Sequence, residues 1–424
     1  MRNNNLIDHL FEVNKYNYNT LDLCQYELQR IIYGYGNHFK NNLELFNPKR
    51  HRVKHFIRIA YFLYQYCYLG ELSKDTTHIV SNAYYDFNSE LNNLGYSVYR
   101  PVLSMKKWEP VLANLKLLME ADSISRTFQN ANFGEILCQE FTDLIEKFQK
   151  KMQKLFIQKK VAALFVPNDA AFFERLSISI FRAIMKPSFI FLHGLPTRYN
   201  DIDDNRADYL IVWGEKIKES YVKAGVEKNK ILISGHPYFK EYRDHPLKFD
   251  LSNILIITQS MPWTPLNSNE VILSDRGNSI LYLFSIERVL RELGVTSVKF
   301  RPHPVENSGW YFKFLNKTFY RLDDRALLKA LSEATMVIGP SSTVFLESIY
   351  YGVNYVVYDP TINNKDLRNY PLVPPFDGSD NRIPVANSEN DLKYIISNKV
   401  AVDRSFFPEY AKIPFDINFI KEII

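Results

Sequence analysis

Three hydroxyl side chains lie together where an apolar run passes into an amphipathic one. Ser341, Ser342 and Thr343 follow residues 335–339, which predict a β-strand, and open residues 342–351, which predict a helix. The start of a helix presents unpaired backbone N–H groups and the positive end of the helix dipole, so it attracts anions. The segment therefore predicts a phosphate-binding site. The structural alternative is a plain helix cap.

A cation and an imidazole end another predicted strand, residues 297–301. Arg301 and His303 lie at its carboxyl edge, and Gln259 follows the predicted strand 253–258. In an open α/β sheet, ligands bind beyond the carboxyl ends of the strands. Together with the hydroxyl-rich segment, these residues favour a nucleotide phosphate site over a loop that merely exposes an arginine and a histidine.

The loop 193–208 follows the predicted strand 188–192 and is also polar. It begins with the imidazole of His193 and carries the carboxylates of Asp201, Asp203 and Asp204. A carboxylate near a substrate can act as a nucleophile or as a general base. The alternatives are a solvated acidic loop or a divalent-metal site, and no partner motif of the usual type supports the metal.

His236 follows the predicted strand 230–234 within Gly235-His-Pro. At the carboxyl end of a strand it either lines the same site as His193 or lies in a turn as a buried histidine. The residues alone leave both interpretations open.

The elements that must position these residues alternate between strand and helix from residue 77 onward. Short apolar runs rich in β-branched and aromatic residues, separated by helices, indicate buried parallel sheets. Strands are predicted at 78–83, 96–99, 161–166, 188–192, 209–213 and 230–234, and then at 253–258, 297–301, 335–339 and 355–358. Helices are predicted at 87–94, 280–293, 325–332 and 342–351, and helices fill roughly 104–158.

This pattern predicts an α/β protein with two Rossmann-type domains that face one cleft. Residues 1–240 form the first domain, with a helical N-terminal elaboration over roughly the first 75 residues; residues 241–400 form the second, and 401–424 a C-terminal tail. The polar segment 240–248 is the expected linker.

Composition limits the function classes. The chain has 424 residues, a formal net charge of +5 and no dense Lys/Arg block, so nucleic acid is not an expected partner. Residues 147–160 predict a basic amphipathic helix, which belongs either to a domain surface or to a membrane contact. The three cysteines have no metal-ligand spacing, and the longest apolar run, 57–69, is too short to span a bilayer. We therefore expect a cytoplasmic protein, with peripheral association at the inner membrane face as a further possibility.

Neither a Gly-x-Gly-x-x-Gly sequence nor a Walker loop occurs, which disfavours dinucleotide binding. Arg-Pro-His-Pro at 301–304 and Pro-Ser-Ser at 340–342 resemble the HP and SS motifs of bacterial transferases that use CMP-activated acidic sugars. His193-Gly, Asp208-Tyr-Leu, Trp213-Gly and Gly235-His-Pro look most like the retaining β-Kdo glycosyltransferases of capsule and O-antigen assembly. The acidic motif of the sialyltransferases is absent in its usual form, because Asn205 follows the two aspartates.

The resemblance implies a GT-B fold, CMP-β-Kdo as donor, a saccharide or lipid-linked saccharide acceptor, and no metal or other cofactor. It also implies that Asp203, or else Asp204, attacks the anomeric carbon, while His193 and His236 position that carboxylate or handle the acceptor proton. The residues expected to bind the donor are Arg301, His303, Ser341, Ser342, Thr343, Glu347 and Gln259. A sialic-acid-type or CDP-glycerol-dependent transferase and a noncatalytic sugar-nucleotide-binding scaffold protein remain the alternatives.

Overall fold

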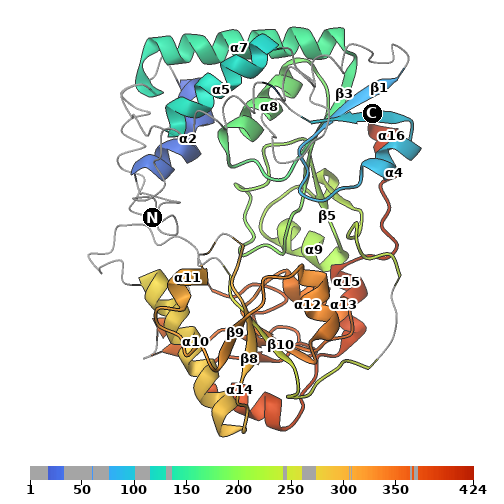
Figure 1. Ribbon diagram of the computed structural model, residues 1–424. Coiled ribbons are helices and arrows are strands. Elements are labelled where there is room, and N and C mark those ends of the chain that lie inside the picture. The colour runs from blue at the N-terminus through green and yellow to red at the C-terminus, as the bar shows by residue number, and fades with distance from the viewer. Residues whose placement is uncertain are drawn as a thin grey trace.

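The computed structural model describes residues 18–32, 60, 76–100, 115–129, 136–241, 246–259, 274–304, 306, 308–362, 365–366 and 371–424. Two parallel sheets with helices around them account for most of this part of the chain, one in each half of the sequence (Figure 1).

The first sheet has six parallel strands in the order β2-β1-β3-β4-β5-β6. They are β1 (Thr77–Ser81), β2 (Tyr96–Tyr99), β3 (Val161–Val166), β4 (Ser188–Phe191), β5 (Tyr209–Val212) and β6 (Ile231–Ile233). The helices of this half are α2 (Tyr18–Ile32), α4 (Asn88–Asn93), α5 (Leu115–Gln129), α7 (Gln139–Gln158), α8 (Phe172–Ala183) and α9 (Glu215–Lys223). Every residue of β3 and β4 is buried, because helices cover both faces of a parallel sheet.

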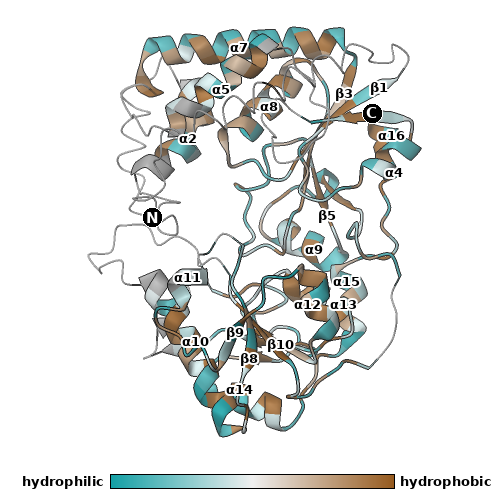
Figure 2. Cartoon of the chain, viewed as in Figure 1, coloured by the Kyte–Doolittle hydropathy of each residue, from teal (hydrophilic) through white to brown (hydrophobic). Residues whose placement is uncertain are grey.

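The second sheet also has six parallel strands, in the order β14-β11-β10-β7-β8-β9. They are β7 (Ile254–Ile257), β8 (Val298–Arg301), β9 (Tyr320–Leu322), β10 (Met336–Gly339), β11 (Tyr355–Tyr358) and β14 (Val385–Ala386). Around them lie α10 (Ser274–Glu292), α11 (Ser308–Tyr311), α12 (Leu327–Glu333), α13 (Val344–Tyr350) and α14 (Glu389–Ser397). Two short antiparallel strands, β12 (Thr361–Ile362) and β13 (Lys365–Asp366), form a separate hairpin. Figure 2 shows apolar strands at the centre of each half and helices with one polar side.

The predicted fold class, a GT-B-like pair of Rossmann-type α/β domains, is confirmed by these two sheets. All ten predicted strands are present, with ends shifted by at most two residues. The strands β9 and β14 and the helix α14 were not predicted. Of the predicted N-terminal helical region, α2 is the main part that the structure describes, and the rest lies outside the described residues, as does much of the predicted linker.

The C-terminal tail returns to the first domain, which the sequence did not indicate. After α15 (Phe407–Tyr410), the N–H of Lys412 donates to the carbonyl of Trp213 at 2.8 Å. The N–H of Asp416 donates to the carbonyl of Ser234 at 2.7 Å, and α16 (Ile420–Ile423) follows. Gly214 is required here, because a Cβ at this position would collide with the backbone of residues 409 and 410.

The predicted basic amphipathic helix exists as the second half of α7. Its apolar side chains Phe148, Met152 and Phe156 are buried in the core of the first domain, so they are not available to a lipid surface. None of the described helices is long and apolar enough to cross a bilayer.

Candidate functional site

Loops from the carboxyl ends of β4 and β10 meet between the two domains. The backbone N–H of Leu195 donates to Oγ1 of Thr343 at 2.8 Å. A Cβ placed on Gly194 would lie 2.9 Å from the same oxygen, so a larger residue would push the two segments apart. The strand-end loop that begins at His193 therefore contacts the segment that leads into α13, as expected for two Rossmann-type domains that share one site.

His193 combines an exposed ring with a fixed tautomer. Its Nδ1 lies 2.9 Å from the carbonyl oxygen of Pro167, and because a carbonyl can only accept, Nδ1 carries a proton; in the neutral ring Nε2 is then an acceptor. The backbone carbonyl of His193 accepts a hydrogen bond from the hydroxyl of Tyr85 at 3.0 Å. The ring of Tyr84, which is 65% exposed, lies 6.2 Å from the imidazole. The arrangement suits proton abstraction from a ligand.

Glu347 lies in the first turn of α13 and is half-buried. Burial raises the pKa of its carboxyl from 4.5 to about 7, since the charged form loses hydration. Burial, and then the nearby Glu347 carboxyl, raise the pKa of the Tyr85 phenol well above its usual value. Because Tyr85 also bonds the His193 loop, the structure gathers His193, Tyr85 and Glu347 around one place between the domains.

His303 is held by Glu306, a residue that sequence analysis missed. Oε2 of Glu306 accepts the N–H of His303 at 3.0 Å and the hydroxyl of Thr258 at 2.5 Å, while Oε1 accepts the hydroxyl of Tyr311 at 2.8 Å. Burial raises the pKa of Glu306 and lowers the pKa of His303. Because its pKa is lowered, the imidazole of His303 is neutral near pH 7, and a neutral imidazole carries one N–H donor. Gln259 lies two residues after the end of β7 and is half-buried.

The hydroxyl-rich segment differs from its expected role in one respect. The backbone N–H of Ser341, predicted to face a phosphate, donates to Oδ2 of the buried Asp359 at 2.8 Å. The Oγ of Ser342 accepts the N–H of Val344 at 3.4 Å, and Thr343 already accepts from the first domain. Because α13 has only seven residues, its dipole is short. The groups left to bind a ligand at this segment are therefore mainly side-chain hydroxyls.

Arg301 is half-buried at the end of β8. Its guanidinium donates to the backbone carbonyls of Asp323 and Arg325, which follow the neighbouring strand β9. Both acceptors are neutral carbonyl oxygens, so they do not neutralise the positive charge of Arg301. Some of its N–H donors are occupied, but the charge still lies near the strand ends.

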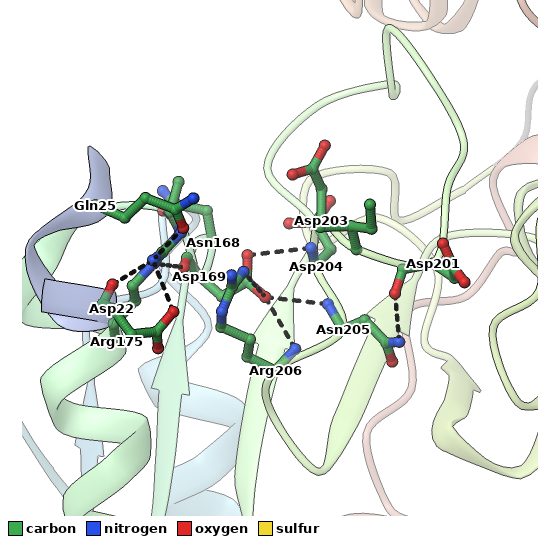
Figure 3. A network of polar contacts seen from close by, with 12 residues as sticks. Asp22, Gln25, Asn168, Asp169, Arg175, Asp201, Asp203, Asp204, Asn205 and Arg206 are labelled. Carbon is green, nitrogen blue, oxygen red and sulfur yellow. Dashed lines mark hydrogen bonds and ion pairs between the residues drawn. The ribbon is translucent and has the colours of Figure 1, made fainter. Parts of the chain in front are cut away.

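The acidic loop is anchored by Asp169, which is 2% exposed (Figure 3). The Asp169 carboxylate accepts the backbone N–H groups of Asp204 at 3.1 Å, Asn205 at 3.1 Å and Arg206 at 2.9 Å. Asp204 has a φ of 58° and accepts the hydroxyl of Tyr221 at 3.0 Å. Burial and then the Asp169 charge raise the pKa of Asp204 to about 6.

Asp203 has different surroundings. Its carboxylate pairs with Arg198, accepts Nδ2 of Asn200 at 3.0 Å and is 43% exposed. Figure 3 shows it pointing away from Asp169. The side chain of Asp201 is exposed. Within the described part of the chain, no hydrogen bond or ion pair joins these three aspartates to the strand-end loops of the second domain.

The predicted catalytic role of His236 needs correction. The residue is 0% exposed, its ring stacks on Phe239 at 4.0 Å, and the rings of Tyr85 and Trp213 each lie 4.6 Å away. Its Nδ1 accepts the N–H of Tyr238 at 3.2 Å. Burial lowers the pKa of His236 to about 3, so it stays neutral. The buried-histidine alternative is the one that the structure shows.

Among the residues that the structure describes, no three His, Cys, Asp or Glu side chains are grouped as ligands for a metal ion. Tyr84 and Tyr85 were not predicted from the sequence, although they follow β1 much as His193 follows β4. The rule that residues after a strand lie at the carboxyl edge, applied to β1, indicates both.

Comparisons with known proteins give likenesses of fold alone. No family model and no curated protein matches the chain. Among solved structures, UDP-GlcNAc 2-epimerase from Neisseria meningitidis bound to UDP-GlcNAc is 11% identical over 82% of this chain and 97% of that chain, with a TM-score of 0.43. The apo form of the lipopolysaccharide outer core galactosyltransferase WaaB is 12% identical over 81% and 97%, with a TM-score of 0.42. MurG from Acinetobacter baumannii is 11% identical over 77% and 92%, with a TM-score of 0.38.

Proposed function

We propose that this chain is a glycosyltransferase that moves Kdo from CMP-β-Kdo to a saccharide acceptor in surface polysaccharide synthesis, with retention of configuration. The observation that carries the proposal is the contact between Leu195 and Thr343. This contact joins the loop that begins at His193 to the segment whose sequence resembles a CMP-sugar motif, which supports a shared site. An enzyme that joins two substrates needs groups from both domains at one place.

The donor side of the proposed site is formed by the loops after β8 and β10. The neutral imidazole of His303 donates to the CMP phosphate as negative charge develops on it, and the hydroxyls of Ser341 and Ser342 add donors. The charge of Arg301 acts at longer range. The half-buried Glu347 is an acceptor for a ribose hydroxyl in its ionised form.

Asp203 is the preferred nucleophile. The Asp203 side chain is 43% exposed and paired with Arg198, so it is open to a substrate, whereas burial raises the pKa of Asp204 to about 6 and its carboxylate is bonded to Tyr221. In the first step a carboxylate oxygen bonds to the anomeric carbon while the bond to the phosphate oxygen breaks and CMP leaves. In the second step the acceptor hydroxyl displaces the carboxylate, and its proton passes to Nε2 of His193.

Intact-protein mass spectrometry with CMP-Kdo and no acceptor tests this proposal. The wild type should gain one Kdo mass on the peptide that contains residues 199–210, and Asp203→Asn should not. Asp204→Asn is the matched control, because it removes a neighbouring carboxylate and should still form the adduct. CMP-sialic acid and CDP-glycerol, offered in parallel, distinguish the alternative donors.

Three outcomes would contradict parts of the proposal. An inverted product without an adduct would make the carboxylate a general base. Turnover of another donor instead of CMP-Kdo would refute the donor assignment. A protein that binds CMP but turns over none of the three donors would be a noncatalytic scaffold.

A further inference from the structure

A pocket with a volume of about 440 Å³ lies at the amino edge of the first sheet. Its walls come from residues that precede strands: Arg182 lies at the end of α8 before β4, Arg206 and Asp208 precede β5, and Lys230 precedes β6. The loops after β4 and β10 leave the opposite, carboxyl ends of their strands. The pocket is therefore separate from the proposed transferase site.

Two cations in this pocket are bonded to neutral oxygens. Nη2 of Arg182 donates to the carbonyl of Arg206 at 2.7 Å, and Nζ of Lys230 donates to the carbonyl and side-chain oxygens of Asn205 at 2.9 and 2.8 Å. Within the described part of the chain, neither side chain has a carboxylate at ion-pair distance. Their charges are therefore uncompensated at close range.

The carboxylates near the pocket are already engaged. Oδ2 of Asp208 accepts both the N–H of Ser188 at 2.9 Å and its hydroxyl at 2.7 Å. The Asp169 carboxylate lies 3.8 Å from the guanidinium of Arg206 but is buried among loop N–H groups. Arg206 also lines the pocket, but its guanidinium is paired with Asp169, so the two cations without an ion-pair partner, Arg182 and Lys230, are set against one lining carboxylate, Asp208, which leaves an excess of positive charge.

We propose that this pocket binds a phosphoryl group. Guanidinium groups offer forked N–H donors that match phosphate oxygens, and a lysine adds a point charge, so the lining suits a compact dianion better than a single carboxylate. The group comes either from a soluble phosphate compound or from a lipid headgroup. The turn between α8 and β4, next to Arg182, carries Met185, which is 90% exposed and gives a lipid an apolar contact.

Occupancy would also affect the acidic loop. Asn205 and Arg206 line the pocket and are held, with Asp204, by the Asp169 carboxylate. A phosphoryl group bonded to Arg206 and Lys230 would fix the end of the loop that carries Asp203 and Asp204. The binding itself does not depend on the proposed transferase activity.

Calorimetric titration with inorganic phosphate at constant ionic strength tests the site on the full chain. Arg182→Gln and Lys230→Gln should each weaken phosphate binding about tenfold, which is the value of one charge-assisted hydrogen bond. Lys150→Gln is the matched control, because that lysine is 77% exposed on α7, outside the pocket, and its loss should leave binding unchanged. Lys230→Arg keeps the charge and should bind nearly as the wild type does, which separates loss of charge from loss of fold.

Two competition arms complete the test. Phosphate should still bind when the protein is saturated with CMP; loss of phosphate binding on CMP addition would place the phosphate at the interdomain site and overturn the proposal. Titrations of Arg182→Gln and Lys230→Gln that match the wild type would also overturn it. Cosedimentation with phosphatidic acid vesicles, lost in Lys230→Gln but not in Lys150→Gln, would assign the lipid source, and phosphate binding without cosedimentation would assign the soluble one. Failure to bind CMP, with phosphate binding intact, would refute only the proposed transferase function.

Discussion

Replacement of Asp169 by alanine should destabilise the first domain strongly, although Asp169 contacts no proposed substrate. Its carboxylate is 2% exposed and accepts three backbone N–H groups, from residues 204, 205 and 206. The alanine variant leaves all three donors without this acceptor. It also removes the ion-pair partner of Arg206 at 3.8 Å.

The expected cost follows from these contacts. A donor that loses its partner in a buried place costs about 1–3 kcal/mol. Residues 204–206 are half-buried, so water can replace part of the loss, and removal of the Asp169 charge relieves Asp204, whose pKa it raises. We expect a net loss of about 3 kcal/mol in the free energy of unfolding, a large fraction of the roughly 5–15 kcal/mol that stabilises a domain.

Urea denaturation followed by tryptophan fluorescence measures this loss, because the buried Trp213 reports on the first domain. Asp201→Ala is the matched control: its side chain is exposed, only its backbone carbonyl is bonded to Asn205, and it should change stability by less than about 0.5 kcal/mol. Equal midpoints for the two variants would refute the view that Asp169 anchors the acidic loop.

Three further predictions concern single groups. Since the pKa of Glu347 is raised from 4.5 to about 7, its ionisation destabilises the fold as pH rises through this window. The stability of Glu347→Gln relative to the wild type should therefore increase between pH 5 and pH 8, by up to about 3 kcal/mol. Melting temperatures at the two pH values measure this, and an equal difference between variant and wild type at both would contradict the prediction. The pKa of His236 is lowered from 6.5 to about 3, so wild-type stability falls as pH drops below 6.5, and His236→Phe should show a shallower acid loss in a pH series of melting curves. His303→Ala should reduce kcat about 10²–10³-fold with an unchanged circular dichroism spectrum, while Ser341→Ala should lose less because it removes one hydroxyl only; near-normal turnover by His303→Ala would refute its role at the leaving phosphate.

The sheets were predictable from the sequence because parallel strands are buried on both faces. A strand such as β3, with all six residues buried, leaves a continuous apolar run that is visible without any partner. The edge strand β9 has two exposed residues of three, and β14 has only two residues, so neither leaves such a run. The return of residues 401–424 to the first domain depends on backbone contacts that no local pattern records.

The candidate site was predictable only to the level of loops. A residue just after a strand lies at the carboxyl edge of the sheet, which is a local rule, and the loop that begins at His193 does contact Thr343, through Leu195. What surrounds a side chain is decided by distant residues. His236 is enclosed by the rings of Tyr85 and Trp213, and Tyr85 is far from His236 in the sequence. The choice between an exposed and a buried histidine therefore required the structure.

Buried or half-buried carboxylates support the loops on both sides of the site. Asp169 accepts N–H groups of the acidic loop, Glu306 accepts the N–H of His303, and Asp359 accepts the N–H of Ser341. In each loop, at least one backbone amide that could bind a phosphate is already bonded to an internal carboxylate. At the proposed donor site we therefore expect side chains to contribute much of the recognition of an anion: the imidazole of His303 and the hydroxyls of the segment that begins at Ser341. Hence side-chain substitutions, and not only changes in backbone conformation, should decide donor affinity at this site.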